Sequence, residues 1–282
     1  MSARKIKKVL LPKAVIEGAG VHLKRVFGYY ELPEFDPFLL LDDFRSDEPS
    51  KYTKGFPWHP HRGIETITYL TAGEVEHGDN LGNKGVIHPG DVQWMTAGRG
   101  IIHQEMPVGD GMGRMHGFQL WANLPAKEKM MPPKYRDFVS SQIPVVKSGT
   151  GVETRVIAGS FNGVNGPADD IVIDPDYFDV KIPASTEHLI PVKKGYKVFI
   201  YVIDGAGSFE EGGTDVYENR TLILFDNGDE VCVKSGNLGV RLLFVSGKPL
   251  NEPVAWGGPI VMNTQDELNK AFSELKDGTF IK

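Results

Sequence analysis

The chain has little of three things that would each point to a definite class of protein. Cys232 is its only cysteine, so the 282 residues cannot form an intramolecular disulfide or a site held by several thiolates. No apolar run approaches the roughly 18 residues that a membrane-spanning helix needs, and the first residues do not resemble a secretion signal. Acidic residues outnumber basic ones, 37 to 31, and the net charge of −6 argues against direct nucleic-acid binding through a basic surface. We expect a cytoplasmic protein (nuclear as well if the source is eukaryotic) that does not bind a membrane.

Glycine and proline, by contrast, are abundant, with 33 and 19 residues. They interrupt many short runs of β-branched and aromatic residues, a pattern typical of all-β sandwiches and barrels. We expect the first strands at residues 8–16 and 21–29. Near the other end, residues 264–267 (TQDE) form a helix-capping sequence that apolar residues follow at helical spacing. The sequence therefore predicts a C-terminal amphipathic helix, preceded at residues 257–263 by an extended arm that crosses between domains.

Two short motifs carry the side chains best suited to bind a metal. The first contains His59 and His61, and the second contains His103 and Glu105. Within each pair one residue intervenes, so a β-strand would place both side chains on the same face. Two such strands side by side in a barrel would aim three imidazoles and one carboxylate at a single point. We therefore predict a metal site built from these residues.

The second half of the chain repeats the first. Residues 69–74 (YLTAGE) resemble residues 201–206 (YVIDGA) at an offset of 132, and the Gly-Asp pair at residues 90–91 recurs at residues 228–229, an offset of 138. Two copies of one strand-and-turn pattern predict two β-barrels in tandem. We expect the N-terminal barrel at residues 1–133 and the C-terminal barrel, with the arm and the helix, at residues 134–282.

Under that alignment the second copy has lost the whole ligand set. Proline, cationic and aliphatic side chains offer no lone pair to a metal. Only the N-terminal barrel is therefore expected to carry chemistry. The residues aligned with the four candidate ligands, in chain order, are Pro191, Lys193, Arg241 and Leu243.

Other interpretations of these polar residues need to be weighed. A buried histidine is more often a hydrogen-bonded core residue than a ligand, and Glu105 could form an ion pair, but the joint loss of four such residues from one copy argues against both. His88 precedes a Pro-Gly turn, so we favour a structural role or support of a ligand over ligation. His116 and Gln119 follow the second motif on the next strand, and we expect them to line the pocket or to orient a ligand.

Ligand chemistry alone leaves the identity of the metal open. Imidazole and carboxylate groups suit iron, manganese, cobalt, nickel, copper or zinc. A set of four protein ligands leaves up to two octahedral positions free for dioxygen and a chelating substrate. A structural zinc site is more often closed and rich in cysteine. The pattern therefore favours an open, reactive centre.

Longer stretches around these motifs resemble the pirin family of the cupin superfamily. The resemblance is dense from residue 36 to residue 133 and weaker, but in the same order, through residue 263. It implies an all-β bicupin, two tandem cupin double-stranded β-barrels, with one mononuclear iron (Fe²⁺ or Fe³⁺) in the N-terminal barrel. The family's three-histidine, one-glutamate ligand set falls on the two motifs without a departure. The segments that carry the resemblance are 36–40 (DPFLL), 56–66 (FPWHPHRGIET), 93–106 (QWMTAGRGIIHQEM) and 116–121 (HGFQLW).

The resemblance implies one of two functions. The first is a flavonol (quercetin) 2,3-dioxygenase, with a flavonol and dioxygen as substrates, carbon monoxide as a product, and Glu105 as both metal ligand and catalytic base. The second is a non-catalytic, iron-dependent redox sensor that binds a transcriptional regulator or a metabolic enzyme. The acidic charge of the chain makes a protein, rather than DNA, the expected partner in that role.

Overall fold

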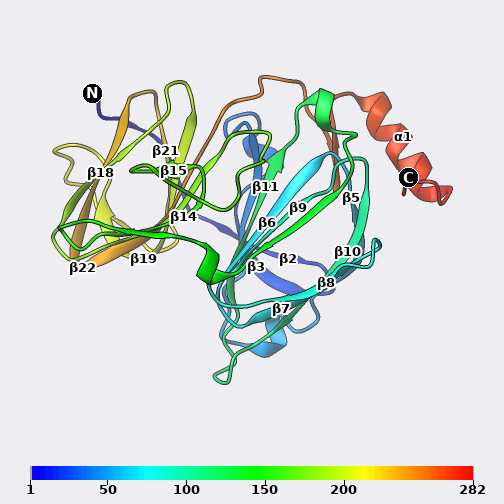
Figure 1. Ribbon diagram of the computed structural model, residues 1–282, viewed down its shortest axis with the longest axis horizontal. Coiled ribbons are helices and arrows are strands. Elements are labelled where there is room, and N and C mark those ends of the chain that lie inside the picture. The colour runs from blue at the N-terminus through cyan, green and yellow to red at the C-terminus, as the bar shows by residue number, and fades with distance from the viewer. Residues whose placement is uncertain (1, 282) are drawn as a thin grey trace. The chain divides into compact units, whose positions relative to one another are not determined.

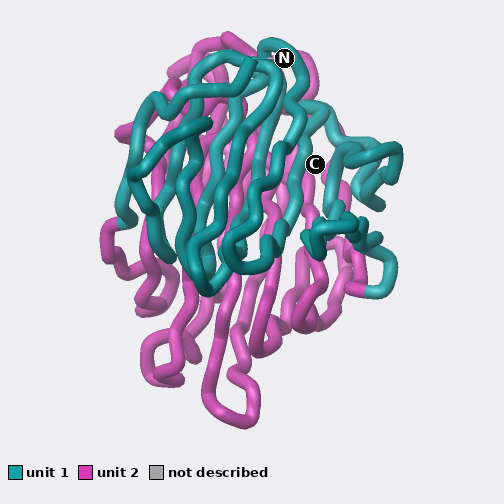
Figure 2. The backbone as a smooth tube through the Cα atoms, turned by 90° about the vertical axis from the view of Figure 1, so that its left-hand side faces the viewer, with its two compact units in different colours: residues 1–12, 141–249 teal, residues 13–140, 250–282 magenta. Residues whose placement is uncertain are grey.

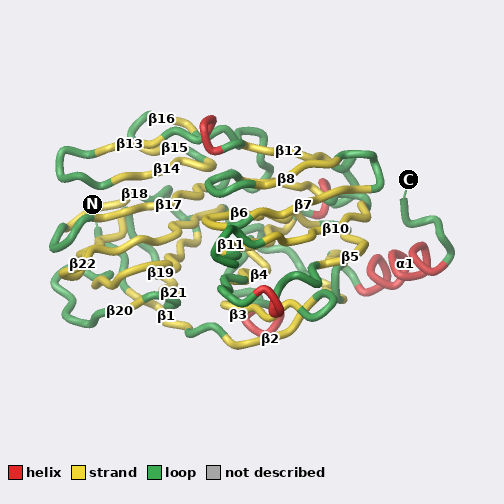
Figure 3. The backbone as a smooth tube through the Cα atoms, turned by 90° about the horizontal axis from the view of Figure 1, so that it is seen from below, coloured by secondary structure: helices red, strands yellow, loops and turns green. Residues whose placement is uncertain are grey.

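The computed structural model describes residues 2–281 and consists mostly of β-strands (Figures 1 and 3). The chain forms two compact units (Figure 2). Among the described residues, unit 2 contains residues 13–140 and 250–281, and unit 1 contains residues 2–12 and 141–249. Four short 3₁₀-helices connect strands: η1 (Tyr29–Glu31), η2 (Pro49–Lys51), η3 (Ala126–Glu128) and η4 (Ser140–Gln142).

Unit 2 is built around two antiparallel sheets. A seven-stranded sheet has the order β12-β9-β6-β11-β4-β3-β2, and a four-stranded sheet has the order β5-β10-β7-β8. Large apolar side chains fill the interior of unit 2 and form its core, in which Leu70 and Met95 are fully buried. The strands are β2 (Lys13–Glu17), β3 (Val21–Phe27), β4 (Phe38–Asp43), β5 (Phe56–His61), β6 (Ile64–Ala72), β7 (Glu74–Asp79), β8 (Lys84–Ile87), β9 (Val92–Thr96), β10 (Ile101–Val108), β11 (His116–Asn123), β12 (Lys134–Phe138), β23 (Ala255–Gly257) and β24 (Ile260–Met262).

Unit 1 repeats this plan with a sheet of order β1-β21-β19-β22-β17-β14-β13. Taken position by position, this order matches that of the seven-stranded sheet of unit 2, from β1 in the place of β12 to β13 in the place of β2. The predicted all-β repeat is therefore confirmed. The strands are β1 (Ile6–Leu10), β13 (Val145–Lys147), β14 (Glu153–Ala158), β15 (Ser160–Phe161), β16 (Val164–Asn165), β17 (Asp176–Ile182), β18 (Glu187–Pro191), β19 (Lys197–Ser208), β20 (Tyr217–Glu218), β21 (Leu222–Phe225) and β22 (Glu230–Gly247).

The sequence suggested a boundary between the two barrels at residue 133, but the two compact units do not divide the chain there. The strand expected at residues 8–16 is two strands, β1 in unit 1 and β2 in unit 2, because Pro12 has no N–H to continue a ladder. Strand β12, just past the expected boundary, pairs with β9 of unit 2. The arm expected to cross between domains instead forms the β23–β24 hairpin, which belongs to unit 2.

The register of the repeat also differs from the sequence alignment. The amide of Gly90 donates to the carbonyl of Leu70 at 2.8 Å, and the amide of Arg220 donates to that of Val202, the counterpart of Leu70, at 2.8 Å. Arg220, not Gly228, therefore takes the place of Gly90. Gly90 and Arg220 have φ values of 89° and 68°. The second offset was wrong because an arginine occupies a turn position that ordinarily favours glycine.

The predicted C-terminal helix is α1 (Gln265–Lys276). The hydroxyl of Thr264 accepts the amide of Glu267 at 3.2 Å, and the Glu267 carboxylate accepts the amide of Thr264 at 2.9 Å. This reciprocal pair is the capping box expected from the sequence, and it explains where the helix begins. None of the helices in residues 2–281 is both long and apolar enough to span a membrane. The cytoplasmic location stays a prediction.

Candidate metal centre

Strands β5 and β10 of unit 2 carry both predicted motifs and pair with each other. Their antiparallel register sets His103 opposite His59, and Ile101 opposite His61. Because directly opposed residues share a face of the sheet, the three histidines project to the same side. β5 is an edge strand, which is why it tolerates Pro57 within the ladder. A bulge beside Pro57 separates the pairing of His103 from that of Glu105.

The three imidazoles converge. Ring centroids lie 4.9 Å apart for His59 and His61, 4.3 Å for His59 and His103, and 5.1 Å for His61 and His103. One nitrogen from each ring lies within 4.8 Å of the other two. Burial, and next the neighbouring His59, lower the pKa of His61 to about 3. Burial also lowers the pKa of His103 well below its usual value. Both rings are therefore neutral near pH 7, the form in which imidazole binds a metal.

The outer nitrogens of two rings are held by backbone carbonyls. His59 Nδ1 lies 2.8 Å from the carbonyl oxygen of Pro57, and His61 Nδ1 lies 3.0 Å from that of Pro259. Since a carbonyl oxygen only accepts, we assign the proton to Nδ1 in both rings. This tautomer leaves each Nε2 lone pair free to bind a metal, the usual arrangement for a ligating histidine.

His103 provides a test of whether the site fits a metal ion. It is 1% exposed, and neither ring nitrogen has a hydrogen-bond partner among the described residues. An unsatisfied buried imidazole costs free energy unless something else binds it. A metal ion held together with His59 and His61 would satisfy one of these nitrogens. The donor set of three imidazole nitrogens therefore fits a transition metal.

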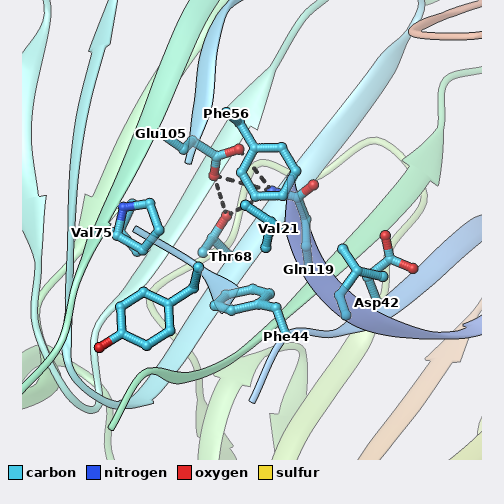
Figure 4. Close-up of a pocket in the computed structure, with 11 residues that line it drawn as sticks. Val21, Asp42, Phe44, Phe56, Thr68, Val75, Glu105 and Gln119 are labelled. Atoms are coloured by element: carbon cyan, nitrogen blue, oxygen red, sulfur yellow. Dashed lines mark hydrogen bonds between the residues drawn. The ribbon is translucent and has the colours of Figure 1, made fainter. Parts of the chain in front are cut away.

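Glu105 lies beside the three histidines but is held by other groups. Gln119 Nε2 donates to its two carboxylate oxygens at 3.1 and 3.0 Å, and the Thr68 hydroxyl donates at 3.1 Å (Figure 4). Its oxygens lie outside the group of nitrogens that are within 4.8 Å of one another. Glu105 thus faces the same pocket as His59 and His61, held by Gln119 and Thr68, and its role as a fourth ligand stays a prediction.

The amide of Gln119 is itself oriented by a neighbour. Trp121 Nε1 donates to Gln119 Oε1 at 3.2 Å, so the amide nitrogen must face Glu105. The Trp121 ring also meets His61 edge to face at 5.0 Å. A continuous set of contacts thus joins the imidazole cluster to the carboxylate. Gln119, expected to line the pocket or orient a ligand, lies in the pocket wall and holds Glu105.

A pocket of about 660 Å³ opens in front of the histidines. Aromatic side chains from five positions contribute to its wall, together with Glu105 and Gln119. Below Glu105 lies a separate cavity of about 20 Å³, which has room for one water molecule (Figure 4). A volume of several hundred Å³ with aromatic walls suits a planar, mostly apolar small molecule. The aromatic residues are Tyr29, Phe56, Trp58, Trp121 and Trp256.

The C-terminal segment completes this site. Arg62, next to His61, is 2% exposed and pairs with Glu274 of α1 at 2.6 Å. Its guanidinium also donates to the carbonyl of Phe280 at 2.8 Å. Gly63 must be glycine, because a Cβ there would lie 2.0 Å from the carbonyl oxygen of Val261. The segment that supplies the Pro259 carbonyl is therefore bonded directly to the strand that carries His61.

His88, expected to have a structural role or to support a ligand, and His116, expected to line the pocket or to orient a ligand, both lie outside the pocket wall. His88 is exposed on the β8–β9 turn, where its ring lies within 4 Å of Glu74 and Asp91. His116 Nε2 contacts Asp47 at 2.6 Å. Neither histidine contributes to the pocket wall. Proximity in sequence to the second motif was a poor guide, because His116 enters β11 near its pairing with Ala72, at the opposite end of the strand from Asn123.

In unit 1 the places of the ligands are taken by aliphatic residues. Glu76 of β7 faces Met106 of β10, and its counterpart Ser208 faces Lys234 of β22. Lys234 is therefore the counterpart of Met106, and the counterparts of His103 and Glu105 follow by counting back along β22. The four counterparts assigned from the sequence alone were out of register. Three of the true counterparts are fully buried, so the interior of unit 1 offers no ligand at these positions. In the order of the ligands they are Ile190, Val192, Val231 and Val233.

Several residues that shape the site carried no signal in the sequence. Pro259 lies in the segment interpreted only as an arm, Trp256 directly precedes that segment, and Arg62 appeared only as part of a family motif. Their contribution depends on contacts between residues about 200 positions apart, such as His61 with Pro259. The one available hint was the Gly-Gly-Pro sequence at residues 257–259, which predicts a tight turn but not its neighbour.

Comparison with known proteins agrees with this architecture. The pirin family model matches residues 20–122, and the model of the pirin C-terminal cupin domain matches residues 177–281. The chain belongs to the pirin family. Its two β-units are therefore the two cupin domains of a pirin, as the resemblance in the sequence implied.

Named relatives extend along almost the whole of this pirin. A pirin-like protein of Caulobacter vibrioides is 42% identical over 99% of this chain and 100% of its own length. A protein of Pseudomonas aeruginosa, provisionally named quercetin 2,3-dioxygenase, is 43% identical over 93% of each chain. The crystal structure of a quercetin 2,3-dioxygenase from Acinetobacter baumannii superposes with a TM-score of 0.90 at 32% identity, covering 99% of both chains.

The role of the C-terminal segment can be tested with Glu274→Ala. Removing one partner of a buried ion pair leaves the Arg62 guanidinium uncompensated, so we expect the free energy of unfolding to fall by about 3 kcal/mol. We also expect faster loss of bound metal, because the strand that carries His61 loses its support. Urea denaturation and metal release to a chelator measure the two effects. Asp266→Ala, which removes an exposed carboxylate from the same helix, is the control. A less stable protein with an unchanged metal-release rate would mean that the segment supports the fold but not the site.

Proposed function

We propose that this pirin is an iron-dependent dioxygenase that cleaves flavonols, with the metal held by His59, His61, His103 and Glu105. The observation that carries the proposal is the set of three converging imidazoles, one with both nitrogens unsatisfied, at the head of a broad aromatic pocket. Relatives named quercetin 2,3-dioxygenase, one in sequence and one in structure, support the choice of substrate.

The choice of iron rests on the donor set and on the reaction. Nitrogen and carboxylate ligands suit several first-row metals, and a site with no thiolate is unlike most structural zinc sites. Three imidazoles and one carboxylate leave coordination positions for exogenous ligands. Iron, when bound, would supply a Lewis-acidic centre that activates an enolic hydroxyl and takes part in one-electron chemistry with dioxygen.

The residues of the chain account for the remaining requirements. A flavonol presents a hydroxyl next to a carbonyl, and Glu105 is the base placed to accept the hydroxyl proton on a carboxylate oxygen. Gln119 and Thr68 hold that carboxylate by neutral donors, which orient it without a competing positive charge. The aromatic walls bind the planar rings and exclude water. In the overall reaction both atoms of dioxygen enter the ring-opened product, and the ring carbon that bore the hydroxyl leaves as carbon monoxide.

The link between metal and turnover can be tested with His61→Ala. Loss of one imidazole should weaken iron binding by more than about 100-fold and abolish dioxygen consumption with quercetin. Elemental analysis, electron paramagnetic resonance and an oxygen electrode measure metal and turnover together. His22→Ala, at an exposed histidine on β3, is the control. Stoichiometric zinc without iron in the active wild-type protein would contradict the choice of metal, and a lack of turnover by the iron-loaded wild type would contradict the reaction.

The role of Gln119 as a positioning residue can be tested separately. Gln119→Leu removes the donor to Glu105 but none of the proposed ligands, so iron should stay bound while kcat falls about 10- to 100-fold. A changed electron paramagnetic resonance spectrum should accompany the loss, because the carboxylate is free to reorient. Gln104→Leu is the matched control, because Gln104 lies on the same strand as Glu105 but does not line the pocket. An unchanged spectrum and an unchanged kcat in Gln119→Leu would show that Gln119 does not position Glu105.

A regulatory function is the second candidate, and the sealed interior of unit 1 favours it. Ile190, Val231 and Val233 leave that cupin domain without ligands at the corresponding positions, so its retention calls for a role other than metal chemistry. We propose a protein-binding role for it, sensitive to the oxidation state of iron in unit 2. Pull-down with ferrous, ferric and metal-free protein is the test. Recovery of a partner by only one of the three forms would support the switch, and identical recovery by all three would exclude it.

A further inference from the structure

A row of polar side chains crosses the seven-stranded sheet of unit 2. Each member is paired in register with the next on the neighbouring strand, so all project to the same face. This is the inner face, because three members of the row contribute to the pocket wall. From β3 to β12 the row consists of Arg25, Asp42, Gln119, Thr68, Gln93 and Asp137.

The corresponding row of unit 1 contains no polar residue. The same succession of register pairs runs from β14 to β1 through aliphatic and aromatic side chains. Five of these residues belong to the core of that unit. The same sheet is thus stable with an apolar row, so folding does not require the polar one. The row consists of Val156, Phe178, Phe244, Ile200, Ile223 and Val9.

One end of the polar row is a guanidinium shared by two carboxylates. Arg25 donates from Nε and Nη2 to the two oxygens of Asp42 at 2.9 and 2.8 Å, and from Nη1 to Glu17 at 2.9 Å. One positive charge therefore faces two negative charges. The side chain of Glu17 is 42% exposed and that of Arg25 is 29% exposed, so a ligand can reach these two, whereas the side chain of Asp42 is only 8% exposed and meets the pocket at its wall. Such a surface accepts hydrogen bonds from neutral hydroxyl groups and repels anions.

The cluster lies in the pocket at a distance from the metal centre that suits an aromatic ligand. Glu17, Arg25 and Asp42 all line the same pocket as His59 and His61. Gln119, which touches Glu105, is on β11, and Arg25 is two strands away on β3. Neighbouring strands are about 4.8 Å apart, so Asp42 on β4 lies roughly 5 Å, and Arg25 roughly 10 Å, across the sheet from Gln119. Tyr29 and three indole rings line the same pocket.

We propose that Glu17, Arg25 and Asp42 form a subsite that selects uncharged aromatic ligands with a phenolic hydroxyl at the end remote from the metal. The hydroxyl donates to a carboxylate of this cluster, and a sulfonate or carboxylate at the same place is repelled. This inference deepens the proposed function and rests on it for the orientation of the ligand. It makes Asp42 and Glu17 specificity-determining residues rather than parts of the reacting centre.

The proposal is tested with probes that differ only away from the chelating group. 3-Hydroxyflavone and quercetin share the hydroxyl and carbonyl that would face the metal, but only quercetin has hydroxyls on its other rings. A ring-sulfonated quercetin adds a negative charge. Binding to the iron-loaded protein under anaerobic conditions is followed by quenching of tryptophan fluorescence, since three tryptophans line the pocket. The variants are Asp42→Asn and Glu17→Gln, and the control is Glu76→Gln on the exposed face of β7.

The ratio of the two affinities is the deciding quantity. A hydrogen bond to a charged group that only quercetin can make should favour it over 3-hydroxyflavone, and Asp42→Asn should reduce that preference about tenfold. Glu17→Gln should reduce it less, because Glu17 is more exposed, and both variants should bind the sulfonated probe better than the wild type does. If both folded variants keep the wild-type affinity ratio, the subsite is excluded. The proposed function has a separate test: it is contradicted if the iron-loaded protein consumes no dioxygen with any probe. The affinity ratio can still be measured in that case, because binding is followed without turnover.

Discussion

The pairing of β5 with β10 is the constraint on which the metal centre depends. His59 and His103 are directly opposed in this ladder, and His61 follows two residues after His59 on the same face. Successive residues of a strand face opposite sides, so a slip of one residue would turn an entire motif away from the pocket. The edge position of β5 permits Pro57 within the strand, and the carbonyl of Pro57 in turn orients His59. The backbone of β5 around Pro57 therefore determines the orientation of a candidate ligand as well as the path of the strand.

The two cupin domains show what the fold requires and what the site adds. They share the strand order of the larger sheet, yet the positions that hold imidazoles on one sheet of unit 2 and a polar row on the other hold aliphatic and aromatic side chains in unit 1. A buried polar group is costly unless it is paired, whereas an apolar row packs without that demand. The polar row, including Gln119 beneath Glu105, is thus an addition to the fold. Because both units share the fold, only the side chains of unit 2 give it a candidate metal site.

Each end of the chain belongs to the unit that is built mostly from the other half. Residues 2–12 supply β1 to unit 1, and residues 250–281 supply the hairpin and α1 to unit 2. The second exchange concerns the chemistry, because it brings the Pro259 carbonyl to His61 and Glu274 to Arg62. A cut at residue 133 would remove a sheet strand from one unit and these contacts from the other. The chain is not two separable domains joined end to end.

The sequence by itself determined the local features: an all-β chain, a repeat, a capped C-terminal helix, and two motifs whose alternation points their side chains one way. These follow from periodicity and from contacts a few residues apart. Only the tertiary structure decided that Arg220 replaces Gly90, that Gln119 and Thr68 hold Glu105, and that Pro259 orients His61. It likewise joined Arg25 to Asp42 across neighbouring strands. Such contacts depend on the register of whole sheets and on segments distant in the chain, which no local pattern of residues encodes.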